Sequence, residues 1–241
     1  MENFNTSSPE IIKIQKGLRL TKTLLVSSLV AGEKHTGKKT LIKNIFPDAF
    51  WIDARDIKEV KRALELHQEV VLTNFDKSLP YNESDFYSKR VVAICDDPTI
   101  AKKKESLFSF VYLLPSLKDR PEDVKILTKI FLNEAKEIIG ADIDVNMENL
   151  DISQNIKSLK KCIYKKVFSS SLDKNEIKSI LYSYLYDVLD EENGYRELIE
   201  VFEKPLIEAG LKKYRSQLKL ASILKINRNT LRKKIYELGI D

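Results

Sequence analysis

The chain has 241 residues, of which 43% are apolar and 32% are charged, and its formal net charge is +5. This length and apolar content suffice for one or two buried cores and exclude a disordered chain. No apolar run reaches the roughly 18 residues of a membrane-spanning helix, and the polar segment Met1–Glu10 lacks the apolar core of a signal peptide. With two cysteines and two histidines, we expect a reducing cytoplasm, no disulfide scaffold, no Cys/His zinc site and no Ser-His-Asp chemistry.

Strands and helices are expected to alternate in the first half of the chain. A helix is predicted to begin at Ser8-Pro9-Glu10, because proline is favoured at the first helical position. The strands expected after it are Thr23–Ala31, Ala49–Asp53, Glu69–Phe75 and Arg90–Cys95, with helices at Lys38–Ile45 and Ile57–His67 between them. This alternation predicts a parallel α/β sheet with both faces covered.

From Glu122 onwards every long periodic segment is predicted to be helical. Apolar residues at i, i+3, i+4 and i+7 mark a helix over 175–191, and a second begins at Tyr195, with a kink expected at Pro205. Two short helices follow, at Gln217–Leu224 and Asn229–Leu238. Because a segment this short buries little by itself, helices 175–191 and 195–213 are predicted to form a homodimer with a four-helix core.

Positive charge is concentrated at the carboxyl end. Residues 211–241 contain nine basic and two acidic side chains, a balance of +7, which leaves −2 for residues 1–210. A basic end on a nearly neutral body is typical of contact with a phosphate backbone, and a solvated basic tail is the alternative.

Residues 217–238 have the pattern of a helix-turn-helix. Ala221 is small where two helices must approach, Asn227 or Asn229 can cap the second helix, and Leu231 and Ile235 are expected to face inward. The second helix then leaves polar and cationic side chains on its exposed side, and these are Arg228, Thr230, Arg232, Lys233 and Lys234. A recognition helix needs this arrangement, because its first residues reach base edges while flanking cations hold phosphates.

The stretch Gly194–Asp241, with its EKPL segment and the tail INRNTLRKKIYELGI, resembles the Fis-type DNA-binding domain. The resemblance implies that Asn227, Arg228, Thr230, Arg232 and Lys233 contact double-stranded DNA, and that the two preceding helices form the dimer. Asn229, Lys234 and Lys219 complete the predicted DNA-binding set. The sequence departs from the family at Lys225 in place of the turn glycine, at Leu218, and at Tyr214-Arg215-Ser216 in place of Gly-Asn. A lysine at the turn must adopt an unusual backbone or shift the turn.

A phosphate-binding loop is predicted between the first strand and the helix after it. The segment GEKHTGKKT contains Gly32, Gly37, Lys38, Lys39 and Thr40, which are the predicted nucleotide-binding residues of the loop. Glycines let backbone N–H groups approach phosphates, and the lysine neutralises them. Two interpretations stay open: the loop binds ATP or ADP, or it is a structural remnant.

Residues 8–166 resemble the AAA+ domain of the NtrC-type activators that act with sigma-54. GEKHTGKKT resembles that family's GESGTGKE loop, residues 110–140 resemble its stretch leading into a lid helix, and 155–159 resemble its NVREL motif, with Lys157 in place of the sensor arginine. The resemblance implies an α/β P-loop domain over 1–118, a helical lid over 119–168 and an all-α Fis-type helix-turn-helix domain over 171–241. It also adds Lys157 to the nucleotide-binding set.

Several departures bear on catalysis. The strand at 69–75 ends in Asn74 and Phe75 where the family has Asp-Glu, and Asp76 is a stand-in one or two positions late. The arginines that reach a neighbour's nucleotide align with Lys104 and Phe110, and the polar sensor aligns with Cys95 or Asp96. Lys39 occupies the place at which other P-loop proteins have a metal-binding Ser/Thr, no GAFTGA loop is present between Ile57 and Glu69, and we expect no receiver domain ahead of the body. Because phosphoryl transfer needs a metal, a positioned water and cationic charge, we expect no catalytic or metal-binding residues and weak or no ATP hydrolysis.

The sequence therefore favours a cytoplasmic, nucleoid-associated bacterial regulator that binds specific DNA. Its AAA+-like module is expected to serve in assembly, in effector sensing, or in contact with RNA polymerase or a regulatory protein, rather than as an enzyme. Two alternatives remain: an ATP-hydrolysing activator of the NtrC type, and an AAA+-related interaction protein whose helix-turn-helix is only a scaffold.

Overall fold

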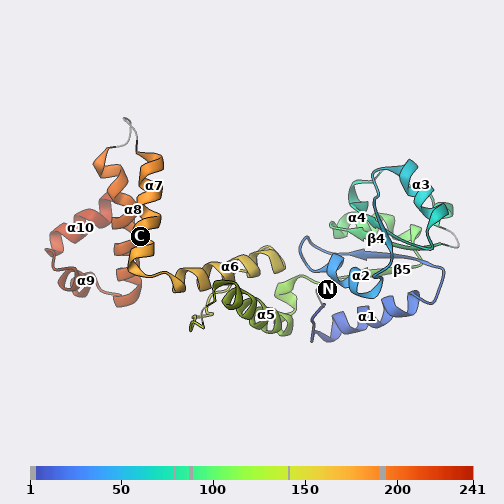
Figure 1. Cartoon of the computed structure of the whole chain (residues 1–241), viewed down its shortest axis with the longest axis horizontal. Helices are drawn as coiled ribbons and strands as arrows, with labels where there is room; N and C mark the ends of the chain where they lie inside the picture. The colour runs from blue at the N-terminus through green and yellow to red at the C-terminus, as the bar shows by residue number, and fades with distance from the viewer. Residues whose placement is uncertain (1–3, 79, 87–88, 141, 190–193, 241) are drawn as a thin grey trace. The chain divides into compact units, whose positions relative to one another are not determined.

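The computed structural model describes residues 4–78, 80–86, 89–140, 142–189 and 194–240. The chain divides into two compact units, residues 1–171 and residues 172–241 (Figure 1). Among the described residues, no helix combines the length and the apolar character that crossing a membrane requires.

The first unit is built on a five-stranded parallel sheet. Its strands are β1 (Ser27–Ala31), β2 (Phe50–Asp53), β3 (Glu69–Thr73), β4 (Arg90–Cys95) and β5 (Phe110–Leu113). They lie in the order β2-β3-β4-β1-β5, so β1 is paired with β4 on one side and with β5 on the other. The predicted parallel α/β fold is thus confirmed, and the first strand is brought beside one that comes much later in the chain.

Helices cover both faces of this sheet. On one face α1 (Pro9–Thr21) and α2 (Lys38–Ile45) pack against alternate strand residues such as Val30. On the other face α3 (Ile57–Leu66) and α4 (Pro98–Lys104) pack against the intervening ones. Figure 1 shows α1 and α2 on the side opposite α3 and α4. Because both faces are buried, the central strands are continuous apolar runs rather than alternating ones.

Three strand predictions differ from the structure. The first strand begins at Ser27 rather than Thr23, because the backbone N–H groups of Thr23 and Leu24 donate to the last carbonyls of α1 and close a turn. The third strand ends at Thr73, and a short 3-10 turn, Phe75–Lys77, takes its expected last residue. The edge strand β5 was not expected.

Two further helices form the lid of this unit. They are α5 (Pro121–Ile139) and α6 (Asn155–Ser171), and Gly140 ends α5 in the left-handed conformation that glycine favours. Their shared core contains Phe131, Leu159 and Ile163.

The described residues of the second unit form four helices: α7 (Lys174–Val188), α8 (Tyr195–Tyr214), α9 (Gln217–Leu224) and α10 (Arg228–Glu237). Helix α7 begins in a capping box between Asp173 and Glu176, and α8 runs through Pro205. The expected end of the first of these helices and the Asn193 turn fall on residues 190–193, outside the described residues.

Candidate nucleic-acid interface and phosphate-binding site

The last three helices pack around one small core, in which Ile207, Leu220 and Leu231 are buried. Helix α9 approaches α8 at Gly210, where an added Cβ would lie 2.4 Å from a methyl carbon of Leu220. Ala221 is also buried, as its small size at a helix approach predicted. Helix α10 is therefore held with one face inward through Leu231, and its opposite face is free to contact a partner.

The turn between α9 and α10 keeps its usual shape despite the missing glycine. Lys225 adopts the left-handed conformation, with φ 53° and ψ 39°. The N–H of Ile226 donates to the carbonyl of Ala221 at 3.1 Å, which closes the helix end. Asn227 then caps α10, because its side-chain oxygen accepts the N–H of Asn229 at 2.8 Å. Of the two caps that the sequence allowed, the structure uses Asn227.

The exposed face of α10 contains most of the predicted DNA-binding residues. Those that are exposed are Asn227, Arg228, Asn229, Thr230, Arg232 and Lys233. Lys219 is exposed on α9, with its ammonium 5.6 Å from the ring centre of Tyr214. Guanidinium groups at the start of a helix suit both base edges and phosphates.

Lys234 differs from the expectation that it lies on the exposed face. Its Nζ donates to both carboxylate oxygens of Glu203 on α8, at 2.6 and 2.7 Å, and its side chain is 33% exposed. This pair holds α10 against α8. The correction follows from helix geometry, since Lys234 lies three residues after the buried Leu231 and thus near the packed face.

In the first unit, the predicted phosphate-binding loop lies between β1 and α2. At Gly32 an added Cβ would lie 2.5 Å from the carbonyl oxygen of Leu114. Gly37 has a φ of 98°, and an added Cβ there would lie 3.0 Å from the ring of Phe4. Only glycine fits these two positions, so both predicted glycines have a structural reason that is independent of any ligand.

Lys38 is the most constrained residue of the loop. Its buried Nζ donates to the carbonyls of Gly32 and Glu33 at 2.8 and 2.6 Å, and lies 2.9 Å from the Oδ1 of Asp96. Burial lowers the pKa of Lys38, while the hydrogen bond and charge of Asp96 act in the opposite direction. Asp96 follows β4 and was expected only as a possible sensor position. Its partnership with Lys38 arises because β4 is the neighbour of β1.

The residues at the positions of the catalytic acids face elsewhere. The Asn74 amide donates to a carboxylate oxygen of Asp53 at 2.8 Å, and Phe75 is fully buried in the core. Asp76, the stand-in, accepts the backbone N–H of Asp96 at 3.2 Å. The described part of the chain contains no group of three or more His, Cys, Asp or Glu side chains that could hold a metal ion.

Lys104 and Phe110 align with the arginines that would reach a neighbouring subunit. The Nζ of Lys104 donates to the carbonyl of Phe75 at 2.9 Å and to the hydroxyl of Ser78 at 3.0 Å, within its own unit. Burial lowers its pKa. Phe110 is 42% exposed on the edge strand β5.

The lid is hydrogen-bonded directly to the loop. Asn155 donates to the carbonyl of Lys34 and to the carboxylate of Glu33, both at 3.0 Å, and the N–H of Ile156 donates to the carbonyl of His35 at 3.1 Å. From the start of α5, the buried guanidinium of Arg120 donates to the carbonyl of Thr36 at 2.9 Å. The loop is therefore held by four hydrogen bonds from three lid residues as well as by its own turns.

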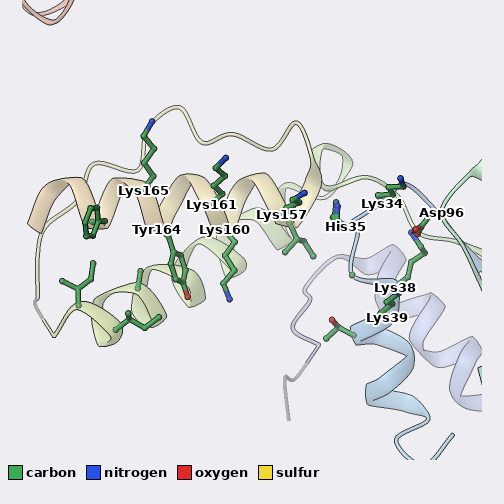
Figure 2. A pocket seen from close by; sticks show the side chains of 17 residues that line it. Lys34, His35, Lys38, Lys39, Asp96, Lys157, Lys160, Lys161, Tyr164 and Lys165 are labelled. Atoms are coloured by element: carbon green, nitrogen blue, oxygen red, sulfur yellow. The ribbon is translucent and has the colours of Figure 1, made fainter. Parts of the chain in front are cut away.

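A cavity of about 960 Å³ opens between the loop and the lid (Figure 2). The structure brings five predicted nucleotide-binding residues to its wall: Gly37, Lys38, Lys39, Thr40 and Lys157. Gly32 does not line the cavity, but its carbonyl accepts a hydrogen bond from Lys38. The wall also contains Lys34, Lys160, Lys161 and Lys165, which the sequence analysis missed. For Lys161 and Lys165 the sequence did contain a signal: they follow Lys157 at i+4 and i+8, and this spacing places the three lysines along one side of α6.

A smaller cavity of about 220 Å³ adjoins the first and shares Gly37, Thr40, Ile156 and Lys160 with it. Its other walls come from Phe4 and from the lid, including Arg120, Asp123 and Phe131. Asp123 fixes the amino-terminal segment here, since its carboxylate accepts the Thr6 hydroxyl at 2.8 Å. A cavity wall that combines apolar side chains with a few polar ones is typical of small-molecule sites.

Residues 198–238 match the family described as "Bacterial regulatory protein, Fis family". Over 170 residues the chain is 27% identical to the DNA-binding transcriptional regulator NtrC of Rhizobium meliloti (strain 1021), covering 53% of this chain and 35% of NtrC. The chain therefore spans about a third of the length of this curated relative.

Two solved structures of NtrX from Brucella abortus share the fold. The complex with ATP has a TM-score of 0.55 at 14% identity and covers 100% of this chain and 70% of NtrX. The complex with ADP has the same TM-score and identity and covers 99% of this chain and 70% of NtrX. Residues 198–238 of the second unit thus match a Fis-family model, and the chain shares its fold with NtrX.

Proposed function

We propose that this chain, which combines a Fis-type helix-turn-helix with an NtrC-type AAA+ fold, is a transcriptional regulator that binds specific DNA sequences in the bacterial cytoplasm, at the nucleoid. One observation carries the proposal: the cationic face of α10, with Arg228, Arg232 and Lys233, is exposed while Leu231 holds the opposite face in the core. The N-terminal residues of such a helix reach base edges in the major groove, and the flanking cations hold phosphates.

We further propose that two copies pair through α7 and α8. Among the described residues of α7, none is buried within its own chain, and Ile177, Ile180 and Tyr184 are about half exposed. Phe202 and Leu206 on α8 are also exposed. A dimer that covers these faces would place two recognition helices in successive major grooves, about one helical turn apart.

The test is a gel-shift assay on DNA fragments selected from a random pool by the purified full chain. Arg228→Ala combined with Arg232→Ala should remove most binding, because both guanidinium groups are exposed on the recognition face. The control, Lys13→Ala combined with Lys16→Ala, removes the same charge from the exposed side of α1 and should leave binding unchanged. Unaltered binding by the arginine variant would refute this assignment of the DNA-contacting surface.

The salt dependence of DNA binding provides a second test of the same surface. The logarithm of the binding constant should fall linearly with the logarithm of the salt concentration, because phosphate contacts release counterions. Loss of one phosphate contact should reduce that slope by about 1. Equal slopes for the wild type and the double arginine variant would argue that neither arginine contacts a phosphate.

For the first unit we propose a nucleotide-binding module, for ATP or ADP, that does not hydrolyse its ligand. The glycine loop, Lys38 and the adjoining cavity support binding, whereas the positions of Asn74 and Phe75 argue against hydrolysis. Its role would be in assembly, in effector sensing, or in contact with RNA polymerase or another regulatory protein. ATP turnover that disappears in a Lys38→Ala variant would instead favour an ATP-hydrolysing activator.

A further inference from the structure

The loop–lid cavity contains more positive charge than the chain neutralises. Lys38 is paired with Asp96, and Lys160 is paired with Glu134 at 2.9 Å. The other lysines of the wall form no ion pair within 4.0 Å among the residues that the structure describes, although Lys161 lies close enough to Asp151 to help lower the pKa of that carboxyl; they are Lys34, Lys39, Lys157, Lys161 and Lys165. Figure 2 shows Lys34 at the loop and Lys157 at the loop end of α6, with Lys161 and Lys165 further along one side of that helix. Like charges gathered at this density are unfavourable unless an anion compensates them.

The same site does not fit the magnesium ion that usually accompanies a nucleotide in a P-loop fold. In such folds a Ser/Thr hydroxyl after the loop lysine and an acidic side chain at the end of a neighbouring strand hold the ion. Here Lys39 follows Lys38, so an ammonium occupies the place of the hydroxyl. At the end of β3, the Asn74 amide is engaged by Asp53 and Phe75 is buried.

The remaining carboxylates near Lys38 do not restore a metal site. Asp96 is engaged by Lys38 itself, and Asp76 accepts the N–H of Asp96. A divalent cation beside Lys38 and Lys39 would lie next to two ammonium groups, which disfavours it electrostatically.

From these contacts we propose that the cavity binds a nucleoside polyphosphate without a divalent metal, and that its lysines supply the positive charge that magnesium supplies elsewhere. Lys39 lies in the first turn of α2, where the helix dipole adds to its attraction for phosphate. The lysines of α6 also line the cavity, with Lys157 at the loop end of the helix, and would neutralise the outer phosphates. This inference rests on the nucleotide binding proposed above and specifies the ionic form of the ligand.

The charge of the site predicts an order of affinity. Each additional phosphate gains lysine partners, so ATP should bind more tightly than ADP, and ADP more tightly than AMP. Inorganic tripolyphosphate should compete with ATP, because the lysines recognise the phosphates rather than the base. Magnesium should weaken binding, because it neutralises the phosphates before they reach the lysines.

The experiment is isothermal titration calorimetry of the full chain with ATP, once in excess EDTA and once in excess magnesium. We expect a higher affinity in EDTA than in magnesium. Lys39→Thr restores a hydroxyl after Lys38, and it should weaken binding in EDTA by about tenfold, the loss expected for one charge-assisted contact. In magnesium this variant should bind at least as well as in EDTA, which reverses the wild-type preference.

Matched variants separate this site from a general effect of charge. Lys43→Thr makes the same change at an exposed position one turn further along α2, outside the cavity wall, and should behave as the wild type. On the lid, Lys161→Ala should weaken binding in EDTA, whereas Lys129→Ala, an exposed lysine of α5 away from the cavity, should not. Thermal unfolding of each variant without ligand checks that it is folded.

The outcomes distinguish failure of metal-free binding from failure of the proposed nucleotide binding. ATP binding that is present in magnesium and lost in EDTA would overturn metal-free binding and leave a nucleotide-binding module standing. Binding in neither buffer, with folded protein, would overturn the nucleotide-binding module and this inference with it. Unchanged affinity in both Lys39→Thr and Lys161→Ala would show that these lysines do not hold the ligand, and would also overturn the inference.

Discussion

The Nζ of Lys38 lies 2.9 Å from the Oδ1 of Asp96, at the carboxyl ends of the neighbouring strands β1 and β4. In this ion pair Asp96 engages the Lys38 ammonium group that would otherwise contact a phosphate. A ligand must therefore displace a carboxylate before Lys38 can bind it, which makes Asp96 a competitor for phosphate as well as a stabilising partner.

Asp96→Asn should make nucleotide binding several-fold tighter and the ligand-free protein less stable. The stability loss should be about 1–2 kcal/mol, below that for a fully buried pair, because the Asp96 side chain is 32% exposed. Calorimetry with ATP and thermal unfolding measure the two effects. Asp48→Asn, at an exposed position, is the control. Weaker ATP binding in Asp96→Asn would mean that Asp96 assists the ligand rather than competing with it.

Lys225→Gly should stabilise the second unit by about 1 kcal/mol, because glycine adopts the observed positive φ without the steric cost that lysine incurs. Ser222→Gly, in the exposed interior of the same helix, should instead destabilise it by about 0.5 kcal/mol. Urea unfolding measures both free energies. Destabilisation by the change at Lys225 would indicate that its side chain makes contacts whose loss outweighs the strain.

Lys234→Met should lower the stability of the second unit by about 1 kcal/mol, because it removes the partly buried pair with Glu203. Its DNA affinity should keep the salt dependence of the wild type, unlike that of Arg228→Ala, since the Lys234 ammonium is engaged within the chain. Urea unfolding and gel shifts at several salt concentrations test this. A reduced salt slope for Lys234→Met would return Lys234 to the DNA-binding set.

Tyr81 should make stability depend on alkaline pH. Burial raises its pKa to about 12, and its hydroxyl donates to the carbonyl of Ala54 at 2.7 Å. The folded state therefore holds this proton more tightly than the unfolded state, so its contribution is complete below about pH 10 and is lost as the pH rises towards 12.

Tyr81→Phe should cost about 1 kcal/mol at neutral pH, because the carbonyl of Ala54 loses its partner. The difference from the wild type should narrow when urea unfolding is repeated from about pH 9 to about pH 11. A difference that stays constant over this range would show that the hydroxyl does not titrate with unfolding.

Sequence periodicity predicted the sheet class well, because the strands buried on both faces are apolar runs. It erred where local hydrogen bonds compete with the pattern: Thr23 is β-branched and Leu24 is apolar, as strand residues often are, yet the end of α1 takes their N–H groups. The edge strand β5 was missed because its four residues, Phe110–Leu113, carry no distinct periodicity.

In the candidate sites too, features that depend on local spacing could be predicted, whereas contacts that depend on packing could not. The inward Leu231 follows from local spacing, which also narrowed the cap of α10 to Asn227 or Asn229, and the structure uses Asn227. The Lys38–Asp96 pair does not follow from spacing, because it depends on the sheet order that makes β4 the neighbour of β1. The pairing of Lys234 with Glu203 likewise depends on how α10 packs on α8, which no local pattern specifies.

Helix α6 begins at the phosphate-binding loop, through the Ile156–His35 hydrogen bond, and ends at Ser171, the last residue of the first unit. At about 1.5 Å per residue it is roughly 25 Å long. Because α5 packs along α6 through a shared core that includes Leu159 and Ile163, the two helices would tilt together, and a tilt of about 10° at the loop would move the far end of α6 by roughly 4 Å. An adjustment of these helices around a bound phosphate would thus be largest at Ser171, where the first unit ends.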